Sequence, residues 1–322
     1  MSEIKSDKNT HALGNAPLAY ENQGFLNSPE GRGIRILSEY SEPLARFRRE
    51  RIQDTVVFFG SARFRALDEA NQDLELLANT GSKQPAPPEE QPARLPELED
   101  GNVSKLKLRR AEAAVEMARY YEDARRLAFM LTEWSTTLKS RRHRFVVTSG
   151  GGPGIMEAAN RGAHEAGGKT IGLNISLPFE QAPNRYVTPS LNFEFHYFFM
   201  RKYWFAYLAK ALVVFPGGFG TLDEMFELLT LAQTQKLAKK MTVVIYGPTY
   251  WQSVVNLDVL VDKGAISPHD RELFQFADTP EDAFSILKNG LTKNHLTTEV
   301  VPADHEEDTI LRPEIAKTRR RT

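Results

Sequence analysis

The chain has 322 residues, and its 41 Lys and Arg residues nearly balance its 42 Asp and Glu residues. Hydrophobic residues make up 41% of the sequence, which is enough for the core of one large domain or two small ones. A net charge near zero gives no sign of a surface for nucleic acid or membrane. The absence of cysteine excludes disulfides, thiolate metal sites and cysteine nucleophiles.

The first residues, MSEIKSDKNTHALGN, are polar and lack the apolar segment of a signal peptide. No run of about 18 apolar residues occurs, so a membrane span is not expected. We therefore expect a soluble, cytoplasmic protein that has neither a membrane nor nucleic acid as its partner.

The composition predicts a central domain with polar additions. Residues 1–40 are polar and turn-rich and indicate an N-terminal arm, whereas residues 41–297 form a single domain. Within it, residues 81–104 contain five prolines and many acids, so we expect a mobile insertion that buries little surface. Residues 298–322 are polar and end in KTRRRT, which is typical of a solvated tail.

The predicted elements alternate between helices and strands in chain order. A short helix begins at Ser41, an apolar strand covers Thr55 to Phe59, and a long amphipathic helix covers Lys105 to Lys139. The later segments alternate in the same way: RFVVTS, IMEAANRGAHEAG, KTIGLNI, LNFEF, FFMRKYWFAYLAK, ALVVF, TLDEMFELLTLAQTQKL, MTVVIY and TYWQSVVNLDVLVDKG. Strands and helices joined by short loops predict an α/β fold: a doubly wound, mostly parallel sheet with helices on both faces.

Two glycine-rich loops follow two of these strands, in TSGGGPGIMEAAN (148–160) and PGGFGTLDE (216–224). In an open α/β sheet both loops lie at the edge where ligands bind. Glycines let backbone N–H groups approach an anion, and the helix after each loop points its positive end at the same place. The pattern favours a phosphate-bearing ligand. The alternative is that the glycines serve only tight turns and close packing.

Several common sites do not fit the sequence. The dinucleotide pattern G-x-G-x-x-G fails because Glu157 and Asp223 occupy the final glycine position. AHEAGGKT lacks the first glycine of a P-loop and lies between a helix and a following strand, the reverse of the P-loop order. No G-x-S-x-G motif occurs, and the seven histidines show no metal-binding spacing.

Charged residues accompany the second loop. On a helix starting near Thr221, Asp223 and Glu224 lie in the first turn, where Asp223 is best explained as a partner of the helix dipole. Glu224 lies within reach of any ligand in the loop, and its carboxylate could face a ribose and stabilise positive charge or activate water. Arg201 and Lys202 could balance this site, or extend from a half-buried helix to solvent.

These motifs resemble those of a known family. PGGFGTLDE fits the P-G-G-x-G-T-x-x-E signature of the LOG ("Lonely guy") family, the cytokinin-activating phosphoribohydrolases that are often misannotated as lysine decarboxylases. SGGGPGIMEAANRGA resembles the family's other glycine loop, GSAR (Gly60 to Arg63) its first strand-end loop, and MRK (Met200 to Lys202) a further motif. The resemblance covers roughly residues 50–290.

The resemblance implies a Rossmann-like fold, a homodimer or higher homo-oligomer, and no metal or organic cofactor. It implies hydrolysis of a purine nucleoside 5'-monophosphate, such as AMP or an N6-substituted relative, to free base and ribose 5-phosphate. Glu224 and Arg201 become the catalytic pair. The residues expected to bind substrate or phosphate are Gly151, Gly152, Gly217, Gly218, Gly220, Thr221, Ser61 and Lys202.

Two other functions remain open at this point. One is a nucleotide nucleosidase of broad base specificity that acts in salvage. The other is a non-catalytic nucleotide carrier, similar to the related molybdenum-cofactor carriers. The arm, the insertion and the tail depart from the short members of the family, so they leave substrate and assembly undecided.

Overall fold

The computed structural model describes residues 16–79, 100–178, 182–237 and 239–296. Within this part of the chain, seven strands form one sheet in the order β4-β3-β2-β1-β5-β6-β7, and every neighbouring pair is parallel. The strands are β1 (Thr55–Phe59), β2 (Val146–Ser149), β3 (Thr170–Ile175), β4 (Asn192–Phe195), β5 (Ala209–Val214), β6 (Thr242–Tyr246) and β7 (Gln275–Ala277). The predicted doubly wound α/β fold is confirmed.

The central strands are buried along nearly their whole length because helices cover both faces of the sheet. β1 and β6 are buried at every position, and β5 at all but one. In the pairing of β1 with β5, Phe58 lies opposite Val213 and Phe59 opposite Val214. Alternate side chains therefore enter two separate cores.

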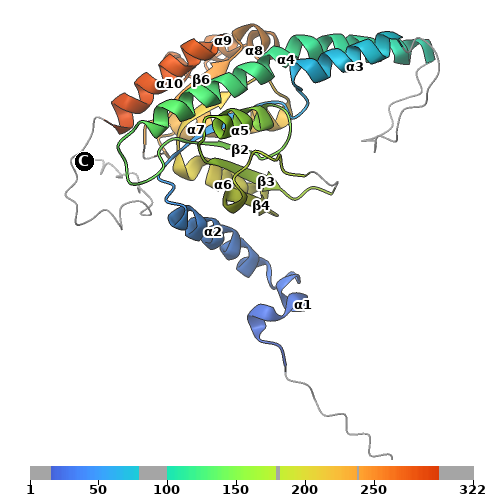
Figure 1. Ribbon diagram of the computed structural model, residues 1–322. Helices are drawn as coiled ribbons and strands as arrows, with labels where there is room; N and C mark the ends of the chain where they lie inside the picture. Colours follow the sequence, from blue (N-terminus) through green and yellow to red (C-terminus); the bar gives the residue numbers. More distant parts are fainter. Residues whose placement is uncertain (1–15, 80–99, 179–181, 238, 297–322) are drawn as a thin grey trace, which may run out of the picture. The chain divides into compact units, whose positions relative to one another are not determined.

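The helices divide between the two faces of the sheet (Figure 1). On one face, α4 (Asp100–Thr136), α5 (Ile155–Glu165) and α10 (Pro280–His295) pack in one apolar cluster with Val56 and Phe58. On the other face lie α6 (Phe198–Leu208) and α7 (Phe219–Gln233), where the ring of Phe205 packs 4.8 Å from that of Phe59. The other helices that follow β1 are α3 (Leu67–Asn79), α8 (Pro248–Val254), α9 (Leu257–Asp262), η2 (Pro189–Leu191) and η3 (Pro268–Leu273).

The sheet changes winding direction between β1 and β5. From β1 the chain proceeds outward through β2 and β3 to β4, then returns to the other side of β1 and continues through β5 and β6 to β7. The carboxyl ends of β1 and β5 therefore mark the switch point, where the crevice that binds a ligand lies in such sheets. The backbone N–H of Ser61 donates to the carbonyl of Pro216 at 3.0 Å and joins the loops after β1 and β5 at this point.

The chain forms two compact units, Met1–Leu44 and Ala45–Thr322. The first contains η1 (Ala19–Glu21), α1 (Gln23–Leu26) and most of α2 (Arg32–Arg49). The predicted helix start at Ser41 was wrong, because α2 begins at Arg32 and contains Pro43 in its interior. Residues 1–15 of the predicted arm, residues 81–99 of the predicted insertion and the predicted tail lie outside the described residues.

Other boundaries also differ from the sequence prediction. The long helix begins at Asp100, inside the segment assigned to the insertion. The segment 249–264 forms two helices rather than one, because the side chain of Asn256 accepts from the N–H of Val259 at 3.2 Å and caps a new helix. Among the described helices, none combines the length and apolarity that a membrane crossing requires.

Candidate active site

The loop after β5 is shaped around Gly217. A Cβ atom at this position would lie 2.2 Å from Oγ1 of Thr221 and 3.0 Å from the backbone nitrogen of Ser61, so only glycine fits. Gly218 and Gly220 are instead exposed, and an added Cβ at either would meet no atom within 4 Å. The loop is therefore tightly packed on its inner side, at Gly217, and free of neighbouring atoms on its open outer side, at Gly218 and Gly220.

The open side of this loop is the N-terminus of α7. Gly218 is the N-cap residue, and its lack of a side chain leaves the first N–H groups of the helix without a side-chain cap. Such groups have no partner within the helix and carry its positive end. Gly217, Gly218, Gly220 and Thr221, the residues of the predicted anion cradle, thus lie at or next to the start of this helix.

The loop after β2 takes a conformation that requires glycine. Gly151 and Gly154 have φ angles of +75° and +70°, in the left-handed region. A Cβ on Gly154 would lie 2.3 Å from the carbonyl oxygen of Ser61, which accepts from the N–H of Ile155 at 3.0 Å. Because the inner side of Gly217 also contacts Ser61, the two glycine loops meet at this residue.

Ser61 contributes to the site through its backbone. Its hydroxyl oxygen accepts from the N–H of Arg63 at 3.1 Å, which is a local turn contact. Its carbonyl and N–H connect the two glycine loops, as described above. Ser61, which the sequence analysis expected to bind the substrate, thus lies between the two glycine loops.

A buried amide network holds the first glycine loop from behind. The Nδ2 atom of Asn184 donates to the carbonyls of Gly151 and Gly152, each at 3.0 Å, and to Oδ1 of Asn160 at 2.9 Å. Asn160 also accepts from the hydroxyl of Ser149 at 2.7 Å. The sequence analysis missed Asn184, which lies 32 residues beyond Gly152, because no local pattern marks so distant a contact.

Glu224 and Arg201 come together as predicted. An Nη2 atom of Arg201, on α6, lies 3.4 Å from Oε1 of Glu224, on α7, and both side chains are largely buried. Burial raises the pKa of Glu224 to about 7, although the positive charges of Lys202 and Arg201 act in the opposite direction. A carboxyl group with this pKa exchanges its proton near neutral pH, which suits a general base.

The guanidinium of Arg201 lies in an aromatic environment. It is 5.2 Å from the ring centre of Phe198 and 5.6 Å from that of Phe205, and burial lowers its pKa. Its Nε atom is buried and finds no acceptor among the described residues. A buried donor without an acceptor is unfavourable, so the group is poised to bond an incoming acceptor.

Lys202 contacts the neighbouring acids. Its Nζ atom lies 2.8 Å from Oδ2 of Asp223 and 2.5 Å from Oε2 of Glu227, and these bonds outweigh burial and raise its pKa. The predicted phosphate-binding role finds no support in these contacts. The explanation of Asp223 by the helix dipole was wrong, because α7 begins at Phe219 and has no acid in its first turn.

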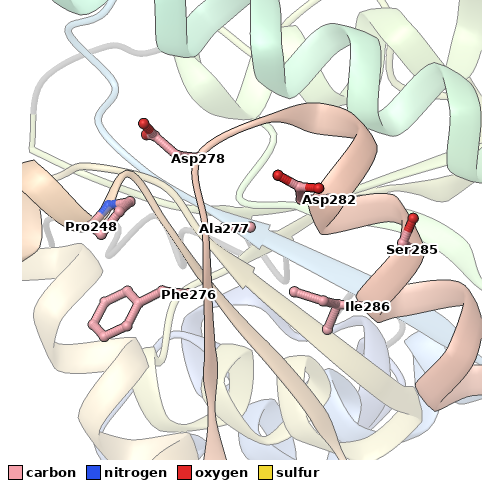
Figure 2. Close-up of a pocket in the computed structure, with 7 residues that line it drawn as sticks. All are labelled: Pro248, Phe276, Ala277, Asp278, Asp282, Ser285 and Ile286. Atoms are coloured by element: carbon pink, nitrogen blue, oxygen red, sulfur yellow. The ribbon is translucent and has the colours of Figure 1, made fainter.

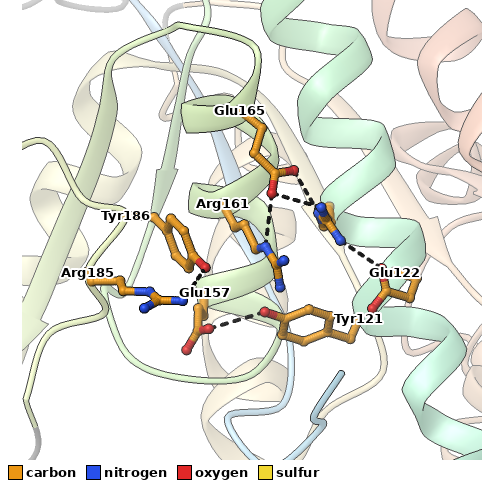
Figure 3. A network of polar contacts seen from close by, with 8 residues as sticks. Tyr121, Glu122, Glu157, Arg161, Glu165, Arg185 and Tyr186 are labelled. Carbon is orange, nitrogen blue, oxygen red and sulfur yellow. Dashed lines mark hydrogen bonds and ion pairs between the residues drawn. The ribbon is translucent and has the colours of Figure 1, made fainter. Parts of the chain in front are cut away.

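A second polar network fixes α5 against α4 (Figure 3). Both oxygens of Glu165 accept from Arg125, at 2.7 and 2.8 Å, and Glu165 also accepts from Arg161 at 3.0 Å. Nearer the glycine loop, the hydroxyl of Tyr121 donates to Glu157 at 3.2 Å. These bonds hold the helix that follows the first loop.

A surface hollow lies elsewhere, between the end of β7 and α10 (Figure 2). It is lined by Pro248, Phe276, Ala277, Asp278, Asp282, Ser285 and Ile286, none of which was predicted as a site residue. Among the described residues, no group of three or more His, Cys, Asp or Glu side chains is arranged to hold a metal ion.

The fold and the crevice define the class: a doubly wound, parallel α/β protein whose two glycine loops meet at the switch point of the sheet. A family model described as "Possible lysine decarboxylase" matches residues 156–287. This match and the curated relatives described next confirm the resemblance to the LOG family that the motifs indicated.

The curated relatives are plant proteins of modest similarity. The probable cytokinin riboside 5'-monophosphate phosphoribohydrolase LOGL5 of Oryza sativa subsp. japonica is 28% identical over 48% of this chain and 62% of its own length. The cytokinin riboside 5'-monophosphate phosphoribohydrolase LOG2 of Arabidopsis thaliana is 24% identical over 54% of this chain and 78% of its own length. The chain thus spans less than two thirds of the first of these relatives.

Among solved structures, the molybdenum cofactor carrier protein of Chlamydomonas reinhardtii is 23% identical, with a TM-score of 0.36. The match covers 54% of this chain and 89% of that protein. The fold assignment rests on the parallel sheet of the chain itself.

Proposed function

We propose that the protein hydrolyses the N-glycosidic bond of purine nucleoside 5'-monophosphates to free base and ribose 5-phosphate. The observation that carries this proposal is the position of Glu224. It is a buried carboxyl group next to Arg201, one helical turn beyond the glycine loop at the N-terminus of α7. A phosphate and an adjacent sugar would suit such an arrangement, because the anion site and the carboxylate lie in sequence along one helix.

In the proposed reaction, the glycosidic bond between C1' and the base nitrogen breaks, and its electron pair leaves with the base. The carboxylate of Glu224 stabilises the positive charge that develops on the ribose. It also accepts a proton from the water that attacks C1', and this proton is then passed to the departing base, which restores the carboxylate. The products are the free base and ribose 5-phosphate, with no net gain or loss of protons.

We assign the phosphate to the backbone of the two loops. Gly217, Gly218, Gly220 and Thr221 supply the N-terminus of α7, and Gly151 and Gly152 supply the second side. The unsatisfied Nε of Arg201 is available to an oxygen of the substrate. We propose that Lys202 acts through Asp223 and Glu227, whose charges it balances beside Glu224.

The choice of a purine base is supported by the names of the matched relatives, which are cytokinin riboside 5'-monophosphate phosphoribohydrolases. We propose AMP or an N6-substituted AMP as the substrate class. No step of the proposed reaction requires a metal ion or an organic cofactor.

A substrate panel tests the proposal. The protein is incubated with AMP, isopentenyladenosine monophosphate, GMP, CMP and UMP, and the release of base and ribose 5-phosphate is measured. Release from the two adenine nucleotides, but not from CMP or UMP, supports it. Similar rates with all five would support the broad nucleosidase instead. Binding without any release would support a carrier and contradict the proposal.

We also propose that the protein acts as a homo-oligomer, with a homodimer as the basic unit. Four phenylalanines on α6 and α7 are exposed although they are large and apolar, a feature typical of interaction surfaces: Phe198, Phe199, Phe219 and Phe226. Sedimentation equilibrium gives the mass of the species. A mass of 36.4 kDa at micromolar concentration, that of a single chain, would contradict this proposal.

A further inference from the structure

Tyr250, on α8, contacts the glycine loop from behind. Its hydroxyl donates to the carbonyl oxygen of Gly217 at 3.0 Å. This bond lies on the buried side of the loop, because Gly217 is buried whereas Gly218 is exposed. Neither the sequence pattern nor the proposed reaction accounts for this bond.

The bond has a consequence for the next residue. In a planar trans peptide, the carbonyl of one residue and the N–H of the next point in opposite directions. When Tyr250 holds the carbonyl of Gly217, the N–H of Gly218 is turned away from α8. Gly218 itself is exposed, and an added Cβ there would meet no atom within 4 Å, so there is room beside this residue for a ligand.

The start of α8 is well fixed, so Tyr250 has a defined position. Gly247 has a φ of +80° and donates its N–H to the carbonyl of Ala277 at 2.9 Å, which turns the chain sharply out of β6. The buried indole of Trp251 donates to the carbonyl of Tyr246 at 3.0 Å. The Tyr250 and Trp251 rings pack edge to face, with centres 5.3 Å apart.

We propose that Tyr250 is a positioning residue that orients the Gly217–Gly218 peptide so that the Gly218 N–H donates to the substrate phosphate. This inference rests on the proposed function, because it deepens the role of the same loop. Tyr250 does not touch the substrate. Without its hydroxyl the peptide can rotate, and the phosphate loses one preorganised donor.

The test is Tyr250→Phe, which removes only the hydroxyl. We expect the affinity for ribose 5-phosphate, measured by titration calorimetry, to fall about tenfold, since one charge-assisted bond is weakened. The KM for AMP rises by a similar factor, while kcat stays within about twofold because Glu224 and Arg201 are unchanged. Tyr246→Phe is the matched control, since its hydroxyl donates to the carbonyl of Asp278 at 3.2 Å, away from the loop.

The outcomes separate this inference from the proposed function. If the unmodified protein binds ribose 5-phosphate and cleaves AMP, but Tyr250→Phe binds as tightly, the positioning role is overturned and the function stands. An equal loss of affinity in Tyr246→Phe would also overturn it, because the effect would be general destabilisation. If the unmodified protein neither binds ribose 5-phosphate nor cleaves AMP, both are overturned.

Discussion

The guanidinium of Arg201 and the carboxylate of Glu224, 23 residues apart in sequence, lie 3.4 Å from each other between α6 and α7. Both side chains are mostly buried, and the pair lies beside a second contact between the same helices, Lys202 with Asp223 and Glu227. Because burial raises the pKa of Glu224 while the two cations lower it, the surrounding charges set the pH range in which this carboxylate is ionised.

The pH dependence of activity follows from this arrangement. Glu224 acts as a carboxylate and has a pKa of about 7, so kcat/KM should rise with pH and level off above that value. Lys202→Met removes a charge that lowers this pKa and leaves Asp223 and Glu227 unbalanced, which raises it. We expect the rising limb to move about one unit toward higher pH.

The pH–rate profile of kcat/KM for AMP measures this shift. Lys288→Met is the control, because Lys288 lies over the ring of Phe284 on α10, on the other face of the sheet. A profile for Lys202→Met that superimposes on that of the unmodified protein would show that Lys202 does not influence Glu224.

The tight packing of Gly217 predicts a strong effect of a single methyl group. In Gly217→Ala, the Cβ would lie 2.2 Å from Oγ1 of Thr221, so the loop must shift away from Ser61. Displacement of the phosphate site should lower kcat/KM for AMP by about 100-fold. Gly220→Ala is the control for stability. Because an added Cβ at Gly220 would meet no atom within 4 Å, its melting temperature in thermal unfolding should not fall below that of the unmodified protein. Wild-type kinetics in Gly217→Ala would refute the packing argument.

The network under the first glycine loop predicts an ordered pair of variants. Asn184→Ala leaves the carbonyls of Gly151 and Gly152 without their side-chain donor and should cost about 1–3 kcal/mol of stability. Asn184→Asp should cost more, because a carboxylate oxygen would then face these carbonyls and Oδ1 of Asn160. Urea unfolding measures both. The opposite order would contradict the assigned orientation of the amide.

An ion pair at the other end of the strands predicts a change in stability without contact to the site. Asp54 is buried and accepts from Nε of Arg144 at 2.7 Å and from the N–H of Phe145 at 2.6 Å. Arg144→Leu leaves this carboxylate without its cation and should lower the free energy of unfolding by about 3–5 kcal/mol at pH 7.

The cost of Arg144→Leu should shrink as the pH falls, because burial raises the pKa of Asp54 and the unpaired carboxyl can take up a proton. Urea unfolding at several pH values measures this dependence. Arg65→Leu, which removes the exposed pair with Asp73, should cost about 1 kcal/mol or less. Equal costs for the two variants would show that burial of Asp54 is unimportant.

The sequence predicted the fold and the two loops well because their signals are local. Apolar runs such as Thr55 to Phe59 mark buried parallel strands, and clustered glycines directly after such runs mark the loops. The resemblance to the family pointed to Arg201 and Glu224 as a pair through two separate motifs, and the structure places the two side chains in contact.

The features that sequence reasoning missed depend on contacts between distant segments. Asn184 and Tyr250 reach the glycine loops from segments 32 and 33 residues further along the chain, and nothing in their own neighbourhoods distinguishes them. The role of Asp223 was misjudged because the helix begins two residues earlier than predicted, which moves the acid beyond the first turn and opposite Lys202. Such errors arise where tertiary contacts, rather than local pattern, decide a residue's role.

The central claim is that Glu224 drives cleavage of the glycosidic bond of a nucleoside monophosphate held by the glycine loops. The most direct measurement compares the unmodified protein with Glu224→Gln, quantifying adenine and ribose 5-phosphate released from AMP while AMP binding is followed separately. We predict equimolar release by the unmodified protein, and in Glu224→Gln no detectable release although AMP still binds. Near-normal release by Glu224→Gln, or none by the unmodified protein, would contradict the account.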